Sequence, residues 1–335
     1  MSRTALPGRV IVGLTAFLLL SLPASAPRAA DDPPVGKMFR PRPHRHDAVE
    51  IEARPILSRY AVSLIRPRRL IARKDGTLFI ADWGGGTVMR VSPEGKASLL
   101  AQDLDEPAGL ALDSMGNLYV STYAQGMKGE GAVYCITSDG MKSVFAVGFS
   151  GPTDLAFDQQ DNLYVANFLD NSISRVTTRG SVSTFVANIA APSALLFDAS
   201  GELLVLSSTE GTVYRISQMA DVAPIARGLS APTDLVLHPA GHVVAVDFGR
   251  GRLMHVTAKG ALKLFAIVPR GTIAAEFDAL GNLVVANWDK TGLLKITTKL
   301  SIKCPHCGRK IPVKLRTPTP KPVPSAEPKP MPPMI

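Results

Sequence analysis

Apolar and polar residues alternate along most of the chain, in short runs that recur at a nearly fixed distance. Residues 162–167 read Asn-Leu-Tyr-Val-Ala-Asn, and residues 281–287 read Gly-Asn-Leu-Val-Val-Ala-Asn. A period of two residues predicts β-strands. The runs 155–158 and 163–167 flank a short turn, so they predict an antiparallel hairpin.

This unit occurs six times. Its turn position repeats every 40 residues, except that the second copy carries five more, and it is held by Gly76, Gly116, Asp161, Gly201, Gly241 and Gly281. A third apolar run follows at a fixed offset, at residues 88–91, 133–136, 173–176, 213–216, 253–256 and 293–296. A fourth run follows a turn at Gly95, Gly140, Gly180 or Gly260. Four strands in about 40 residues are typical of a propeller blade, so we predict an all-β, six-bladed β-propeller.

The two ends of the repeat array predict how the ring closes. Tyr60 lies seven residues before Pro67, as Phe145 lies seven residues before Pro152, so a fourth-type strand from about residue 56 to 64 precedes the first blade. The sixth blade ends near Thr298 without a fourth strand. We therefore expect the N-terminal strand to complete the last blade, which removes open sheet edges.

The segments outside the repeats differ from the repeats in composition. Arg3 and Arg9 precede an apolar run at residues 10–20 and the small residues 24–26, which predicts a signal peptide over residues 1–26 and an extracytoplasmic protein, periplasmic or secreted. The cleavage site is uncertain because Pro27 follows, and a retained anchor is the alternative. The remaining expected divisions are a basic Pro-rich linker (27–54), the propeller (55–299), a Cys-x-x-Cys segment (300–316) and a disordered Pro-rich tail (317–335).

The net charge of +9 lies in the flanking segments, while residues 65–298 carry nearly equal numbers of basic and acidic side chains. The propeller therefore lacks the basic surface expected of a nucleic-acid-binding protein, and we expect no nucleic-acid partner. The basic tails favour contact with an anionic envelope surface.

Cys304-Pro-His-Cys307-Gly resembles one knuckle of a zinc ribbon, so Cys304 and Cys307 are candidate zinc ligands. A complete site needs four ligands, and the chain has no second pair. A disulfide, favoured by an oxidising compartment, and redox chemistry are the alternatives. The third cysteine, Cys135, occupies a strand position and predicts a small, half-buried side chain.

The hairpin of each blade predicts a candidate site at one end of the central channel. Residues seven before and six after each turn position are expected to face each other, which gives the pairs Arg69/Asp82, Gly109/Thr122, Asp154/Asn167, Ala194/Ser207, Asp234/Asp247 and Ala274/Asn287. The second member is polar in every blade and should line a wet channel mouth. The predicted ligand-binding residues are Asp82, Thr122, Asp154, Asn167, Ser207, Asp234, Asp247, Glu276 and Asn287. The alternative is that these side chains satisfy turn backbone groups.

Two features of the mouth bear on its chemistry. Asp234 and Asp247 are like charges expected to lie opposite each other, an unfavourable arrangement unless a proton or a cation lies between them, and Glu276 falls in an otherwise apolar column where its carboxylate requires a partner. The cofactor is left open, with a divalent cation at the channel mouth as the candidate. Aromatic residues that follow the second strands could form a rim that stacks on a sugar, or pack between blades instead: Trp83, Tyr123, Phe168, Phe248 and Trp288.

The sequence Pro-x-Gly-Leu-Ala-Leu-Asp-x-x-Gly-Asn-Leu-Tyr-Val at residues 107–120 resembles the NHL repeat, and the resemblance covers all six blades. NHL-type propellers and the related gluconolactonase-like and streptogramin-lyase-like propellers include interaction modules, sensors, hydrolases and lyases. The lactonase-like members bind a divalent metal at the channel mouth through a Glu-Gly-Pro segment, which this chain lacks.

We therefore expect an exported module that binds a protein, or a small-molecule or carbohydrate ligand, through the mouth of its channel. The alternative is a metal-assisted hydrolase or lyase, with ligands and a general base supplied by Asp154, Asn167, Asp234, Asp247 and Glu276. The sequence assigns no catalytic residue and leaves enzymatic activity open.

Overall fold

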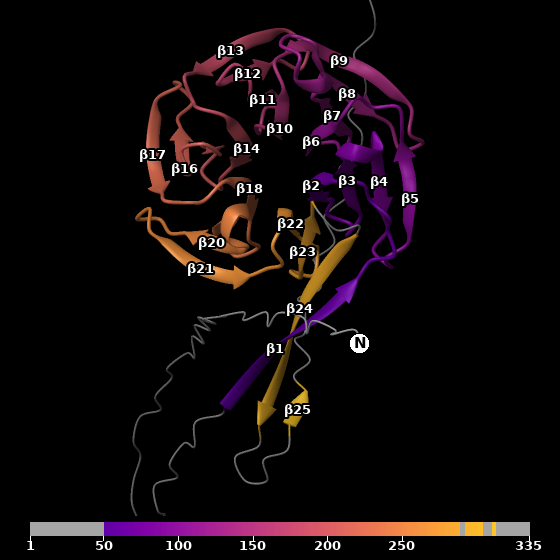
Figure 1. Cartoon of the computed structure of the whole chain (residues 1–335), viewed down its shortest axis with the longest axis vertical. Helices are drawn as coiled ribbons and strands as arrows, with labels where there is room; N and C mark the ends of the chain where they lie inside the picture. The colour runs from indigo at the N-terminus through magenta and orange to yellow at the C-terminus, as the bar shows by residue number, and fades with distance from the viewer. Residues whose placement is uncertain (1–49, 289–291, 304–309, 313–335) are drawn as a thin grey trace, which may run out of the picture. The chain divides into compact units, whose positions relative to one another are not determined.

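A computed structural model describes residues 50–288, 292–303 and 310–312. The signal-peptide segment (1–26), most of the linker, Cys304, Cys307 and the tail (317–335) lie outside the described residues. In the described part of the chain, no helix is long and apolar enough to cross a membrane. The fold is a six-bladed β-propeller, as the sequence predicts, and Figure 1 looks down its ring of blades.

The blades follow one another along the chain. Blade one contains β2 (Pro67–Ala72), β3 (Leu78–Asp82), β4 (Thr87–Val91) and β5 (Ala97–Ala101), and blade two β6 (Pro107–Leu112), β7 (Leu118–Thr122), β8 (Gly131–Ile136) and β9 (Lys142–Phe149). Blade three contains β10 (Pro152–Phe157), β11 (Leu163–Asn167), β12 (Ser172–Val176) and β13 (Val182–Ala187), and blade four β14 (Pro192–Phe197), β15 (Leu203–Ser207), β16 (Thr212–Ile216) and β17 (Val222–Arg227). Blade five contains β18 (Pro232–Leu237), β19 (Val243–Asp247), β20 (Arg252–Val256) and β21 (Leu262–Ile267), and blade six β22 (Thr272–Phe277), β23 (Leu283–Asn287) and β24 (Leu293–Lys303). Short 3₁₀ turns follow three second strands: η1 (Trp83–Gly85), η2 (Ala124–Gly126) and η3 (Phe248–Arg250).

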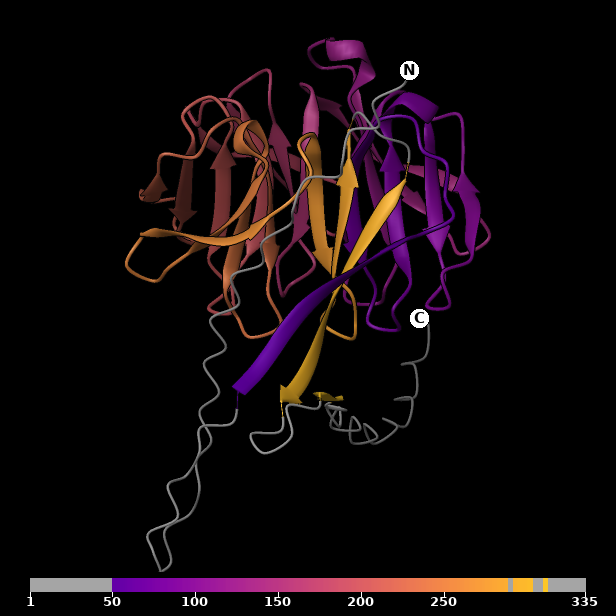
Figure 2. The same ribbon diagram turned by 60° about the horizontal axis from the view of Figure 1, so that its bottom comes forward.

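The first strand of every blade lies nearest the centre, and in blades one to five the fourth strand lies at the periphery (Figure 1). Each inner strand contacts the inner strands of both neighbouring blades, and β22 contacts β2, so the ring is complete. Figure 2 shows the strands of each blade running up and down between the two faces of the ring. The core consists of apolar side chains between successive blades, with five fully buried leucines on the inner strands: Leu70, Leu110, Leu155, Leu195 and Leu235. Each contributes about 1.5–3 kcal/mol through its burial.

The sheet of the sixth blade has the order β1 (Glu50–Arg59), β24, β23 and β22. β1 begins before residue 55, where we expected the propeller to start, and the backbone N–H of Tyr60 donates to the carbonyl of Leu293 at 3.1 Å. The closing role of the N-terminal strand stays a prediction. β24 runs past Thr298 and its end pairs with β25 (Lys310–Pro312), while residues 55–298 and the segments that flank them belong to separate compact units.

Candidate functional site

The beginning of each first strand and the end of each second strand lie at the same end of their hairpin. We call this end of the ring the mouth face. The register there differs from the expected one, because Asp154 pairs with Ala166 and Asn167 pairs with Pro152. A bulge at the residue after the proline shifts the register, and the same shift occurs in the other blades. The predicted facing pairs are therefore wrong: Arg69/Asp82, Gly109/Thr122, Asp154/Asn167, Ala194/Ser207, Asp234/Asp247 and Ala274/Asn287.

The residues that end the second strands are buried rather than lining a wet mouth. None of them is more than 4% exposed: Asp82, Thr122, Asn167, Ser207, Asp247 and Asn287. In four blades the side chain binds a backbone group 17 residues earlier. Both carboxylate oxygens of Asp82 accept from the N–H of Ile65, at 2.7 and 2.8 Å, and Asn287 donates to the carbonyl of Arg270 at 2.7 Å. Ser207 donates to the carbonyl of Ala190, and Asp247 accepts from the N–H of Ser230. These contacts hold the loops that enter each blade, and ligand binding by these residues stays a prediction.

The remaining two side chains of this group bind within their own blades. Thr122 donates to the carbonyl of Ala132 at 3.4 Å. The side-chain amide of Asn167 donates to the hydroxyls of Ser172 and Ser174, at 3.2 and 2.8 Å. Both contacts join the second strand to the third.

The expected repulsion between Asp234 and Asp247 does not occur, since the two carboxylates have different partners. Asp247 accepts from the N–H of Ser230 at 2.8 Å, and its second oxygen lies 3.5 Å from Nη1 of Arg250. Asp234 instead accepts from the N–H of Ala275 at 3.0 Å and forms an ion pair with Arg69. The expected facing of Asp234 and Asp247 is therefore wrong, and neither carboxylate needs a proton or cation shared with the other.

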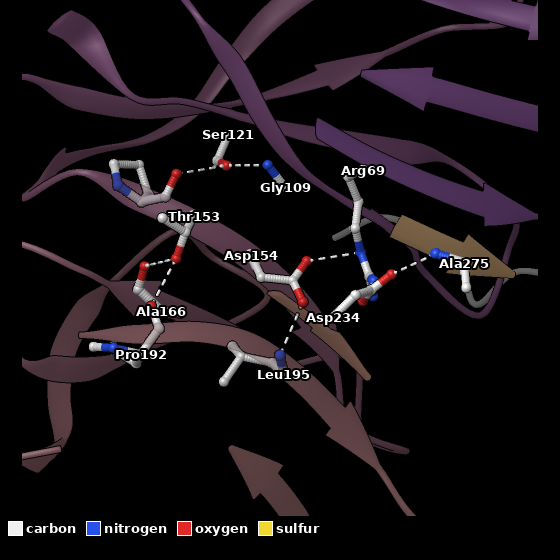
Figure 3. A network of polar contacts seen from close by, with 11 residues as sticks. Arg69, Gly109, Ser121, Thr153, Asp154, Ala166, Pro192, Leu195, Asp234 and Ala275 are labelled. Atoms are coloured by element: carbon white, nitrogen blue, oxygen red, sulfur yellow. Dashed lines mark hydrogen bonds and ion pairs between the residues drawn. The ribbon is translucent and has the colours of Figure 1, made fainter. Parts of the chain in front are cut away.

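Arg69 is the centre of a charged cluster inside the ring, which we call the arginine clasp: Arg69, Asp154 and Asp234. Nε of Arg69 lies 3.0 Å from Oδ1 of Asp154, and Nη1 contacts Oδ1 of Asp234. Figure 3 shows the guanidinium pointing between the two carboxylates. The aspartate side chains are 1% and 2% exposed, and that of Arg69 is 12% exposed. Removing Arg69 would leave two buried carboxylates without their counter-charge.

The clasp follows an alternation of large charged and small side chains around the channel. Its column reads Arg69, Gly109, Asp154, Ala194, Asp234 and Ala274 in blades one to six. A Cβ on Gly109 would lie 2.6 Å from the Cα of Asp154, so only glycine fits there. This alternation is the signal in the sequence that could have identified the clasp.

Each aspartate of the clasp also binds the next blade, because its second oxygen accepts a backbone N–H. Asp154 accepts from Leu195 at 2.8 Å, as Asp234 accepts from Ala275. Burial raises the pKa of Asp154, and the charge of Arg69 opposes this shift. The clasp thereby connects blades one, three and five and, through the aspartates, blades four and six.

Glu276 lies two residues beyond the clasp column on β22. Its carboxylate accepts from the N–H of Phe277 at 2.8 Å and from the N–H of Ala72, so it joins blade six to blade one. Burial raises the pKa of Glu276 to about 7, against the opposing charge of Arg69. The partners expected for this buried carboxylate are therefore present, as two backbone N–H groups.

The clasp bears on the divalent cation that the family resemblance implies. A bound cation would need the carboxylates of Asp154 and Asp234, and Arg69 already supplies positive charge and donors between them. Within the described ranges, no group of three or more His, Cys, Asp and Glu side chains is arranged to hold a metal ion. The residues present do not fit a resident divalent cation, so no step of a mechanism is derived through one.

The aromatic residues after the second strands gather at the mouth face, and all five are half-buried. The ring of Trp83 lies 4.9 Å from that of Tyr123 and 6.4 Å from that of Trp288. The guanidinium of Arg66 lies 5.9 Å from the centre of the Trp288 ring. Phe248 packs on the core next to these residues, Phe168 follows β11, and blade four has Ser208 in this position. Trp83, Tyr123 and Trp288 therefore form a continuous aromatic arc over blades six, one and two.

Arg68 is a functional candidate that the sequence did not reveal. In blades three to five its position holds a hydroxyl that donates to a carbonyl of the next blade. Thr153 donates to Pro192 at 2.8 Å, Ser193 to Pro232 at 3.4 Å and Thr233 to Ile273 at 2.7 Å (Figure 3 shows the first).

Arg68 instead places a half-buried guanidinium near Tyr123 and Asp154. Its guanidinium forms no hydrogen bond or ion pair with the described residues. Burial lowers the pKa of Arg68 below its usual value, while Asp154 opposes this shift. The mouth face thus presents a half-buried cation whose donors are not used by the described residues.

No protein-family model matches the sequence, and no curated protein matches it. Solved propellers are similar in structure. A gluconolactonase from Xanthomonas campestris has a TM-score of 0.63 at 15% identity, covering 72% of this chain and 89% of that chain. A streptogramin B lyase has a TM-score of 0.55 at 13% identity, covering 72% and 98%. A PQQ-bound aldose sugar dehydrogenase from Streptomyces coelicolor has a TM-score of 0.58 at 13% identity, covering 74% and 98%. At these identities the similarity shows the six-bladed propeller fold alone.

Proposed function

We propose that this chain is an exported propeller whose mouth face binds an anionic small molecule that carries a ring, such as a sugar acid. The observation that carries the proposal is Arg68. A half-buried guanidinium without an acceptor among the described residues is ready to bind a carboxylate, since charge-assisted hydrogen bonds are about twice as strong as neutral ones.

The aromatic arc supports the second part of the proposal. Trp83, Tyr123 and Trp288 provide apolar ring surfaces next to Arg68, and Arg66 adds a second positive charge over Trp288. Aromatic faces and a fixed cation suit a ligand that is flat or ring-shaped on one side and negatively charged on the other. A protein segment with an acidic and an aromatic side chain would use the same groups.

A second candidate function is hydrolase or lyase chemistry, and Glu276 is the observation that favours it. A carboxylate with a pKa of about 7 is suited to general acid–base catalysis near neutral pH. Similar propellers include a gluconolactonase and a lyase. However, Arg69 and the two aspartates of the clasp lie in the channel beside Glu276, so binding at the mouth is the function that the site supports better.

The chain offers a direct readout of the mouth, since its only two tryptophans are Trp83 and Trp288. We expect D-glucuronate to change the tryptophan fluorescence of the parent protein, and uncharged D-glucose to leave it unchanged. Arg68→Gln should weaken the glucuronate response by about tenfold, the equivalent of one hydrogen bond from a charged group. Arg90→Gln, which removes a guanidinium from a third strand, is the matched control. A response that is equal for both sugars, or unaltered in Arg68→Gln, would contradict the proposal.

Export is tested separately by mass spectrometry of the protein recovered from cells. An N-terminus near residue 27 in an extracytoplasmic fraction is expected. A cytoplasmic chain that still begins at residue 1 would contradict export, but it would not contradict the proposed ligand.

A further inference from the structure

A cavity of about 360 Å³ lies between blades three and four, at the end of the blades opposite the mouth face. It is bordered by the turn from β10 to β11 and by the turn that follows β16. This volume falls within the roughly 300–1,000 Å³ range that is usual for small-molecule sites. The cavity is therefore large enough for a ligand and is separate from Arg68 and the aromatic arc.

Arg175 gives this cavity an unused donor. Three basic residues in the same third-strand column bind acceptors: Arg90 binds the carbonyl of Ser138 at 3.3 Å, Arg215 binds Glu202 at 3.2 Å, and Lys295 binds Asp278 at 2.6 Å. Nε is buried without a hydrogen-bond partner in both Arg175 and Arg215, but within the described ranges the guanidinium of Arg175 also lacks an ion pair and only lies 6.0 Å from the centre of the Tyr164 ring. The two Nη groups of Arg175, which are not buried in this way and form no hydrogen bond within the described ranges, are the donors that a ligand in the cavity can use.

A substitution between neighbouring blades explains why the groove is open here. Between blades two and three, the backbone N–H and the hydroxyl of Ser114 donate to Asp161, at 2.9 and 2.6 Å. The equivalent positions one blade later are Gln159 and Gly201. Gly201 has no side chain to bind Gln159, whose amide nitrogen lies 3.9 Å from the place where a Cβ would stand. The bridge that closes one groove is thus absent from the next.

The charges of the cavity identify the class of ligand. Arg175 is accompanied by two carboxylates, so the lining carries no excess of positive charge that would select an anion. Asp158 and Asp198 are each bound to their own turns, through the N–H of Gln160 and of Ser200, both at 2.9 Å. The second oxygen of Asp158 also accepts from the side chain of Asn162 at 2.9 Å, and that of Asp198 lies 3.7 Å from Nη2 of Arg215. Each carboxylate oxygen has a further lone pair, so both can still accept from a ligand beside the donors of Arg175 and Gln159. A ligand that both donates and accepts without a net charge fits this combination.

The apolar part of the lining completes the match. Tyr164 packs edge-on against Phe185 at 5.0 Å and Phe197 at 5.2 Å, and all three aromatic side chains border the cavity. Hydroxyl groups on one side of a sugar ring and C–H groups on the other require this mixture of polar groups and aromatic surface. We propose that the groove between blades three and four binds a neutral sugar unit, with Arg175 as its principal donor.

Saturation-transfer NMR tests the proposal with D-glucose, D-galactose and N-acetyl-D-glucosamine as probes. We expect the parent protein to bind at least one of them in the millimolar range, with no change in tryptophan fluorescence because both tryptophans lie at the mouth face. Arg175→Ala should weaken this binding by about tenfold. Arg90→Ala, in the same column of blade one, should bind like the parent.

Gly201→Asp provides an independent variant. It places beside Gln159 the carboxylate that Asp161 supplies one blade earlier, and Asp161 itself has a φ of 57°, close to the 80° of Gly201. The variant should fold, as measured by circular dichroism, and lose sugar binding because the groove is bridged. The proposal is overturned if the parent binds none of the three sugars, or if Arg175→Ala and Gly201→Asp both bind as the parent does.

Discussion

The guanidinium of Arg69, in the first blade, lies 3.0 Å from the carboxylate of Asp154, in the third. The two residues are not neighbours in the ring, so the contact crosses the channel. With Asp234 of blade five on its other side, Arg69 joins three alternate blades through one side chain. Since two carboxylates face one guanidinium, the balance of charge in the channel depends on this residue.

Replacing Arg69 by Met should destabilise the propeller by about 3–5 kcal/mol, because it leaves two buried carboxylates without a counter-charge. Urea denaturation followed by circular dichroism measures the loss. The triple variant Arg69→Met, Asp154→Asn, Asp234→Asn should recover part of it, since no charge is then left unpaired. A loss below about 1 kcal/mol, the value typical of exposed ion pairs, would show that the clasp is not a buried structural contact.

Arg69→Ala should also create a cation site that the parent protein lacks. The carboxylates of Asp154 and Asp234 remain fixed by the N–H groups of Leu195 and Ala275, and a divalent cation can then take the place of the guanidinium. Calcium at millimolar concentration should raise the melting temperature of the variant, as mass action requires, and leave the parent unchanged. If calcium raised the melting temperature of the parent as much as that of the variant, Arg69 would not be occupying the place of a cation.

The contribution of Glu276 to the stability of the propeller should decrease as the pH rises from about 4.5 to about 7, while the lowered pKa values of His238 and His255 act in the opposite direction. The pKa of Glu276 is raised from 4.5 to about 7 in the folded protein, so the folded state binds more protons than the unfolded state in this interval. Its contribution is complete below the unfolded pKa and is lost as the pH passes the folded one, by an amount of about 3 kcal/mol. Asp82, with a pKa raised to about 6, acts in the same direction.

Glu276→Gln isolates this contribution. The amide keeps the shape of the carboxyl group without its titration, so the variant should be more stable than the parent at pH 8 and should show a smaller loss between pH 5 and pH 8. Denaturation curves at the two pH values provide the comparison. An equal loss in parent and variant would mean that Glu276 is not the titrating group.

Deletion of residues 48–64 should unfold or aggregate the propeller, because it removes the strand that we expect to close blade six. Deletion of residues 317–335 should leave the melting temperature unchanged and serves as the control. A protein without residues 48–64 that melts like the parent would refute closure by the N-terminal strand.

The sequence predicted the blades because their apolar period is set locally and is repeated six times. The second and third strands lie where the pattern placed them. The sequence pattern did not predict the register of the strands at the mouth face. A bulge after Pro152, and at the same position in the other blades, adds one unpaired residue that does not change the apolar pattern. That single residue separates Asp234 from Asp247 and directs Asp234 to Arg69.

Contacts between side chains of different blades were the second feature that the sequence did not predict. Arg69 and Asp154 are 85 positions apart in the sequence, and only the closed ring brings them together. The role of Arg68 could not be predicted from its own segment, because it becomes visible only by comparison with the equivalent positions of other blades. Those positions hold hydroxyl groups that bind the next blade, in Thr153, Ser193 and Thr233. The alternation of charged and small residues in the clasp column could have been found by aligning the six blades with one another.

The joints between neighbouring inner strands differ in what holds them. Side-chain hydrogen bonds join blade two to three through Ser121, and later joints through Thr153, Ser193, Thr233 and Glu276. Within the described ranges, none joins β2 to β6, whose shared core is apolar. Apolar contacts weaken on cooling, whereas hydrogen bonds do not depend on that driving force. The contact between the inner strands of blades one and two, beside the arginine that spans the channel, should therefore loosen first in the cold, while Arg90 and the carbonyl of Ser138 still join the outer parts of these blades.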